Sequence, residues 1–167
     1  DVQKHRASKG TPKFKGCLED YLRLIEADSS ITSLSHKRLY SQIISYGVTS
    51  LDETNERRNK LFDGDLVKIY NYFADQFFGM ERSIEKVMRF LHSAAMRGEE
   101  SRQVLLLLGP VGAGKSALVE HIKLALEACA PAYILDECPI REEPLHLIPR
   151  SLRSVFEERY GIKIEGD

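Results

Sequence analysis

The chain has 167 residues, of which 43% are hydrophobic and 29% charged, the balance of a globular protein with room for one domain and a helical extension. Its formal net charge of −1 provides no overall positive field, so composition gives no reason to expect binding to nucleic acid or to an anionic membrane. No apolar run is long enough to span a bilayer, and the first residues are polar and basic, unlike a secretory signal.

A basic arm and a helical region are expected before the main domain. Residues 1–16 carry four lysines and one arginine against a single acid, together with glycine and proline, which predicts a flexible arm. We interpret this arm as a solvated terminus, with an arm for nucleic acid or an acidic partner as the alternative. Residues 17–60 form a predicted helical region, because apolar residues fall at helical spacing over 17–28 and again over 33–46.

The predicted main domain covers residues 61–167 and opens with an apolar stretch followed by an amphipathic helix. An apolar stretch over 61–78 is interrupted by Gly79. A strongly amphipathic helix is expected from Met80 to Ala95, with apolar residues at steps of three and four. Gly98 is predicted to end this helix in a left-handed conformation.

One motif carries recognisable chemistry. Val104–Leu108 is a continuous apolar run, typical of a strand buried on both faces of a parallel sheet. It leads into GPVGAGKS, which fits the Walker A pattern G-x-x-x-x-G-K-[ST], and a predicted helix continues to Cys129. A chance match in a tight turn is the alternative, and the flanking strand and helix argue against it. The predicted phosphate-binding residues are Gly109, Pro110, Val111, Gly112, Ala113, Gly114, Lys115 and Ser116.

The residue types of this P-loop suit Mg-ATP. Glycines allow the backbone to approach phosphate oxygens closely, and the positive end of the following helix favours an anion. Lys115 would bring a point charge to the β- and γ-phosphates, and Ser116 would offer its hydroxyl to Mg²⁺. ATP and Mg²⁺ are therefore the expected cofactors.

Two weaker patterns accompany the P-loop. Residues 132–137 resemble a Walker B strand ending in Asp136-Glu137, but they follow Ser116 after room for only one crossover helix. In ATPases of the AAA+ type the Walker B acid comes after a further strand and helix, so we favour the end of a neighbouring strand over a Mg²⁺-binding pair. The turn at Phe78 and Gly79 either packs against adenine or belongs to an ordinary core with Phe77 and Met80.

Other catalytic and metal-binding patterns are not found. Three cysteines without C-x-x-C spacing argue against a disulfide framework or a zinc site and predict a reducing cytoplasm. His92, His121 and His146 have no partner ligand at i+4 and are interpreted as solvent or core histidines. The sequence lacks the H-R-D and D-F-G signatures of protein kinases and the G-x-S-x-G elbow of hydrolases.

With these residues in view, the segment 61–149 resembles the N-terminal AAA+ region of the bacterial PrkA family, often called serine protein kinases. The matching stretches are FFGMERSIEKVMRFLHSAA, LLLLGPVGAGKS and CPIREEPLHLIP. The resemblance implies cytoplasmic ATP-binding proteins of several hundred residues, with an AAA+ module followed by a kinase-related region. It assigns ATP phosphates to 109–116 and adenine to Phe78-Gly79, and it leaves 138–149 without a role.

The chain departs from that pattern because it ends before a Walker B strand, a sensor residue, an arginine finger or a kinase-related region. Arg150, Arg153 and Arg159 fall in a predicted helix over 151–160, and none is assigned as a finger. We therefore expect the first part of a larger protein. The expected fold is α/β: a helical N-terminal extension precedes an incomplete, AAA+-like P-loop NTPase with a parallel sheet formed by 104–108 and 132–135.

Three functions remain open from the sequence. The chain could be part of an ATPase that regulates an attached kinase-like region, or a nucleotide-gated module that binds ATP without hydrolysing it. A small nucleoside or shikimate-type kinase is the third reading, weakened because the P-loop begins only at Gly109. Self-assembly through AAA+-like contacts is expected by analogy, and the protein substrate or client is not identified.

Overall fold

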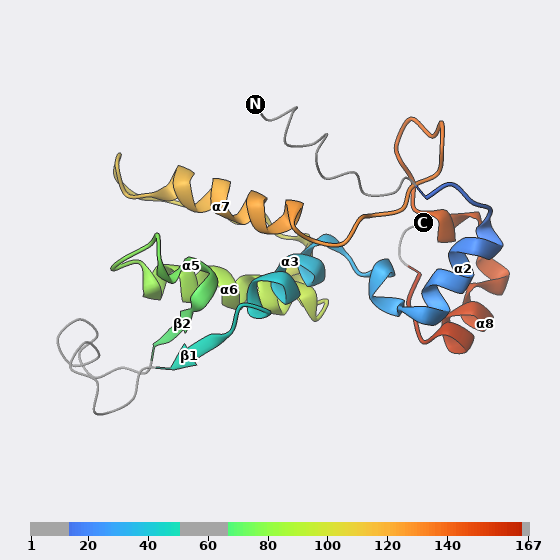
Figure 1. Ribbon diagram of the computed structural model, residues 1–167, viewed down its shortest axis with the longest axis horizontal. Coiled ribbons are helices and arrows are strands. Elements are labelled where there is room, and N and C mark those ends of the chain that lie inside the picture. Colours follow the sequence, from blue (N-terminus) through green and yellow to red (C-terminus); the bar gives the residue numbers. More distant parts are fainter. Residues whose placement is uncertain (1–13, 51–66, 165–167) are drawn as a thin grey trace. The chain divides into compact units, whose positions relative to one another are not determined.

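The computed structural model describes residues 14–50 and 67–164 (Figure 1). They belong to two compact units with separate cores. The central unit covers residues 34–129, and the terminal unit combines described residues of 1–33 with those of 130–167. The predicted limits of the arm, helical region and main domain remain predictions, and residues 1–13 of the arm lie outside the described ranges.

Three helices build the central unit: α3 (Ser35–Ile44), α6 (Glu81–Ala95) and α7 (Lys115–Glu127). Helix α3 packs against both α6 and α7 (Figure 1). The predicted stripe of α6 is confirmed, because its apolar side chains at steps of three and four are buried. The buried residues of α6 are Glu81, Ile84, Val87, Met88, Leu91 and Ala94.

Short elements complete the central unit. Strands β1 (Val48–Ser50) and β2 (Lys68–Tyr70) pair antiparallel, with Val48 opposite Tyr70. The single-turn helix α5 (Asn71–Ala74) follows β2 directly, and the 3₁₀-helix η2 (Glu99–Arg102) follows α6. The apolar stretch predicted over 61–78 thus contains a strand and a helical turn, and its first residues, 61–66, lie outside the described ranges.

The terminal unit brings both ends of the described chain together. Helix α2 (Leu18–Ala27) and the 3₁₀-helix η1 (Ser29–Thr32) come from its first segment, and the 3₁₀-helix η3 (Pro144–Leu147) and α8 (Arg150–Tyr160) come from its second. Asp20 accepts a hydrogen bond of 3.0 Å from the backbone N–H of Cys17 and so caps the start of α2. The core of this unit consists of Tyr21, Ile25, Leu145, Ile148 and Ile164.

Gly98 does not end α6 in the predicted way. The left-handed residue is Arg97, with φ of 64°, whereas Gly98 has φ of −65°. The backbone N–H of Gly98 donates to the carbonyl of Ser93, which closes the end of the helix. Gly98 is needed for space instead, because a Cβ there would lie 2.5 Å from Ser93 Oγ. The prediction was therefore wrong by one residue.

The predicted parallel sheet is not confirmed. Among the described residues only β1 and β2 form a sheet, and neither 104–108 nor 132–135 is a strand. Val104 and Leu108 are 91% and 85% exposed, and only Leu107 of this run packs against the core. A strand buried on both faces needs paired neighbours, and among the described residues no strand pairs with the run 104–108. The predicted helices α2, α3, α6, α7 and α8 are confirmed because each depends on local periodicity. Within these ranges no helix has the length and apolar character needed to cross a membrane.

The core of the central unit can be tested with two phenylalanines. Replacing Phe73, which is 1% exposed, by alanine should lower the free energy of unfolding by about 3–5 kcal/mol, because a cavity remains. The matched variant Phe78→Ala removes the same ring from a position 74% exposed and should change this free energy by less than about 0.5 kcal/mol. Urea unfolding followed by circular dichroism measures both, and equal losses would contradict the described core.

Candidate functional site

The loop 109–116 turns sharply between the extended run before it and helix α7 after it. Gly112 and Gly114 have φ of 84° and 74°, a left-handed conformation that side chains other than glycine rarely adopt. The N–H of Ala113 donates to the carbonyl of Pro110, which closes the turn. These two of the three glycines of the motif are thus placed where the backbone requires them.

Lys115 folds back over this loop. Its ammonium group donates hydrogen bonds to the carbonyl oxygens of Gly109, at 2.7 Å, and Pro110, at 2.6 Å. The first N–H groups of α7 have no partner within the helix, since the first helical bond runs from Leu118 to Gly114. A cation therefore lies beside the positive end of a helix of 13 residues, an arrangement that attracts anions.

The turn at Phe77–Met80 lies against the same loop. A Cβ on Gly114 would lie 3.0 Å from Met80 Sδ, so the thioether contacts the start of α7. Phe77 is buried in the core, which confirms the core reading for that ring, whereas Phe78 is exposed. Gly79 adopts a φ of 76°, which turns the chain between Phe78 and Met80. The binding roles of Phe78 and Gly79 stay a prediction.

Ser116 suits Mg²⁺ as a single ligand. Its side chain is exposed in the first turn of α7, beside the loop. Mg²⁺ usually keeps several waters and takes one or two protein oxygens together with phosphate oxygens. No cluster of three or more His, Cys, Asp or Glu side chains suited to a metal occurs in the described part of the chain. The donor set thus fits a magnesium ion held mainly by bound phosphates.

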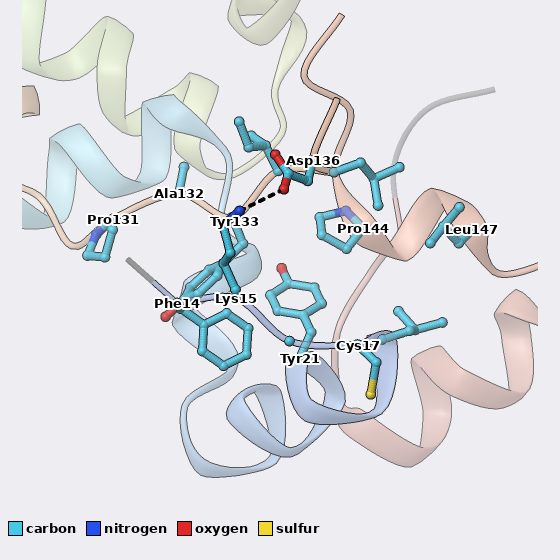
Figure 2. Close-up of a pocket in the computed structure, with 14 residues that line it drawn as sticks. Phe14, Lys15, Cys17, Tyr21, Pro131, Ala132, Tyr133, Asp136, Pro144 and Leu147 are labelled. Atoms are coloured by element: carbon cyan, nitrogen blue, oxygen red, sulfur yellow. Dashed lines mark hydrogen bonds and ion pairs between the residues drawn. The ribbon is translucent and has the colours of Figure 1, made fainter. Parts of the chain in front are cut away.

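Asp136, the residue of the Walker B-like pattern, lies in the terminal unit at a pocket of about 640 Å³ (Figure 2). Lys15 donates a hydrogen bond of 3.2 Å to its carboxylate, and this contact lowers the pKa of Asp136. The aromatic wall of the pocket is formed by Tyr133, whose ring centre is 5.5 Å from that of Phe14 and 5.2 Å from that of Tyr21. The next residue, Glu137, adopts a left-handed φ of 58°. The carboxylate is thus partnered by a lysine, and its role as a magnesium ligand stays untested.

Part of the segment 138–149 has a structural role that the sequence did not reveal. Glu143 accepts hydrogen bonds from the Tyr21 hydroxyl, at 2.7 Å, and from the backbone N–H of Leu145, at 2.8 Å. Leu145 and Ile148 are both buried in the core of the terminal unit. The Glu-Glu-Pro-Leu stretch therefore starts η3 and attaches it to α2. Tyr21 is far from Glu143 in sequence, so no local pattern could have predicted this pairing.

A family model and two sets of relatives relate the chain to PrkA and YeaG proteins. Residues 16–167 match the family model of the PrkA AAA domain. The chain is 34% identical over 171 residues to ATP-dependent protease PrkA of Bacillus subtilis (strain 168), covering 99% of this chain and 25% of that protein. It is 33% identical over 152 residues to serine/threonine kinase YeaG of Escherichia coli (strain K12), covering 87% and 23%.

A shorter similarity, 29% over 107 residues, relates 63% of the chain to 12% of Lon protease 1 of Syntrophotalea carbinolica. No solved structure matches the chain. The chain spans about a quarter of the length of the PrkA and YeaG proteins that it matches.

Glycine substitutions test the conformation of the loop. Gly112→Ala and Gly114→Ala should each lower the free energy of unfolding by about 1–2 kcal/mol, because both residues have positive φ. Gly109→Ala is the matched control, since a Cβ there meets only ordinary contacts of 3.7 Å and longer, and its φ is not positive. Chemical unfolding measures all three variants. Equal stability of the three would show that the loop does not hold the described conformation.

The lysine contact of Asp136 makes a prediction about pH. Lys15→Met should raise the pKa of Asp136 toward its ordinary value, because the hydrogen bond and the nearby charge are both lost. Because the pKa of Asp136 is lower in the folded than in the unfolded protein, the contact stabilises the fold fully at a pH above the unfolded-state pKa. This stabilisation is lost as the pH falls through the folded-state pKa. Carboxyl ¹³C NMR titration measures the shift. Asp28 is the internal control, since its pKa is lowered by Ser30 and should not respond. An unchanged Asp136 titration would contradict the contact.

Proposed function

The chain belongs to the family of PrkA AAA domains, and from this premise we propose that it binds Mg-ATP through the loop 109–116. The observation that carries the proposal is the placement of the Lys115 ammonium over a loop whose glycines at 112 and 114 are left-handed, at the start of α7. Loops of this kind present backbone N–H groups to phosphate oxygens.

Each residue of the loop then has a separate task. The glycines leave room for phosphate against the backbone, and the exposed N–H groups at the start of α7 donate to its oxygens. Lys115 exchanges the carbonyls of Gly109 and Pro110 for the β- and γ-phosphates, where its charge is better compensated. Ser116 supplies a hydroxyl to the magnesium ion that ATP brings. Phe78 and Gly79 lie next to Met80, and we assign them to the adenine ring.

The relatives are named for different activities, but the same kind of segment of each aligns with this chain. One is named an ATP-dependent protease and another a serine/threonine kinase, and both align with this chain over a quarter of their length or less. Proteolysis and phosphorylation of a protein each use ATP differently, so the shared segment is best explained by nucleotide binding. We therefore assign ATP binding to this chain and leave the protease or kinase chemistry to the rest of the whole protein.

Hydrolysis by the chain itself is not part of the assignment. Phosphoryl transfer to water needs an acid for Mg²⁺ and water and a positive charge on the transition state. Asp136 is held by Lys15, and no arginine of the chain is assigned as a finger. A nucleotide-gated module is thus the second candidate for the chain, and an ATPase the first for the whole protein. A cytoplasmic location, AAA-type self-assembly and an unidentified protein client are proposals for that whole protein.

Titration with a fluorescent ATP analogue and Mg²⁺ tests the proposal. Lys115→Ala should weaken binding by about 100-fold or more, because a charge-assisted contact to the phosphates is lost. Lys123→Ala is the matched control: it removes a lysine from the same helix, where it pairs with Glu120, and should leave binding unchanged. Phosphate release in the same samples separates an ATPase from a gated module.

The possible results have different meanings. Binding by the control and loss of binding by Lys115→Ala would support the loop as the site. Equal binding by all three proteins would place the nucleotide elsewhere, and absence of binding by the wild type would overturn the proposal.

A further inference from the structure

His121 lies on the face of α7 that turns toward the core. Gly114, Leu118, His121 and Ala125 follow one another at steps of four, three and four, which places them on one side of the helix. Leu118 and Ala125 are buried in the core cluster of the central unit. His121 is thus the polar member of an otherwise small or apolar stripe, and its polar atoms need partners.

One ring nitrogen and the backbone carbonyl of His121 are both bonded to Tyr72 of α5. The Tyr72 hydroxyl donates to the backbone carbonyl of His121 at 2.9 Å, and His121 Nε2 lies 3.2 Å from the backbone carbonyl of Tyr72. Because a carbonyl oxygen only accepts hydrogen bonds, Nε2 carries the proton and donates it. Two reciprocal bonds therefore join α7 to α5 although the residues are 49 positions apart.

Aromatic contacts reinforce this connection. The His121 ring lies 4.6 Å from the ring centre of Tyr72, 5.7 Å from that of Phe73 and 5.5 Å from that of Phe77. Phe77 immediately precedes Phe78, so the aromatic cluster extends to the start of the turn that we assign to adenine. The imidazole thus anchors the side of the turn that is nearest to α5.

The other side of the turn is anchored separately. Met80 contacts Gly114, at the start of α7, as the position of a Cβ on that glycine shows. The turn at Phe78-Gly79 is therefore attached to α7 at two points, Gly114 and His121, which are two helical turns apart. Since α7 also begins at Lys115, one rigid helix fixes both the phosphate loop and the turn beside it.

We propose that His121 is a positioning residue that sets the recognition of the nucleotide base, by holding the Phe78-Gly79 turn at a fixed distance from the phosphate loop. This inference rests on the proposed function, because it presumes that the loop binds a nucleoside triphosphate. Phosphate binding uses the loop, Lys115 and the start of α7, none of which depends on the bonds to Tyr72. Loss of the His121 side chain should therefore weaken the contribution of the base to the binding affinity and leave the contribution of the phosphates unchanged.

The test compares MgATP with magnesium tripolyphosphate, which carries the same phosphate chain without a base. Isothermal titration calorimetry measures the affinities of the wild type and His121→Phe. The variant should bind ATP about 5- to 10-fold more weakly, which is part of the binding free energy of one stacked base. Its affinity for tripolyphosphate should change by less than about 2-fold. Tyr72→Phe removes one hydroxyl and keeps the rings, so it should give a smaller shift in the same direction. If His121→Phe does not fold, the ATP and tripolyphosphate affinities of Tyr72→Phe test the inference in its place.

His92→Phe is the matched control. His92 lies on α6 with its ring 4.9 Å from that of Tyr40, so this variant also removes an imidazole beside a tyrosine, away from the turn. It should leave both affinities unchanged. If His121 only packs in the core, His121→Phe should weaken the binding of ATP and of tripolyphosphate by the same factor, and that result overturns the inference. An unchanged ATP affinity in both His121→Phe and Tyr72→Phe overturns it as well.

Failure of the proposed function looks different. A wild type that binds neither ligand overturns the phosphate site and the inference with it. A wild type that binds ATP no more tightly than tripolyphosphate keeps the phosphate site and overturns the inference alone, because no base recognition then exists to be set.

Discussion

The hydrogen bonds and ring contacts between α7 and the segment of α5 and the following turn are the interaction on which the placement of that turn in the candidate site depends. Helix α7 supplies Leu118 and Ala125 to the core, and α5 supplies Phe73, the largest fully buried side chain. Burial of these apolar groups provides most of the stabilisation, whereas the hydrogen bonds between Tyr72 and His121 fix the register of the two elements. Because the loop 109–116 leads directly into α7, this packing sets where the turn at Phe78-Gly79 lies relative to the loop.

Local patterns in the sequence predicted the helices well, and with them the start of the site. Helix α6 and helix α7 each have a stripe that repeats every three or four residues, so their existence depends only on neighbouring residues. The family resemblance, inferred from three stretches of sequence, is confirmed over residues 16–167. The glycine-rich loop could also be placed, because left-handed backbone at 112 and 114 demands glycine.

Features that depend on distant partners could not be predicted. An apolar run such as Val104–Leu108 has the composition of a buried strand, but strand pairing depends on segments elsewhere in the chain. The described residues contain no segment that pairs with this run. Phe77 and Phe78 are identical in type, yet one is buried and the other exposed, a difference decided by the rings around His121. The Tyr21–Glu143 bond likewise joins opposite ends of the chain.

The two units differ in what their polar groups do, and this difference bears on function. In the terminal unit Glu143 and Asp136 are each engaged by a side chain of the first segment, Tyr21 and Lys15, so each carboxylate has a partner within its own unit. In the central unit the Lys115 ammonium is bonded only to backbone carbonyls of its own loop among the described contacts. A neutral carbonyl compensates a cation less well than a phosphate does, so exchange of these partners favours an anionic ligand. A cation without a carboxylate partner among the described contacts therefore lies at the loop, which is where nucleotide phosphates are proposed to bind.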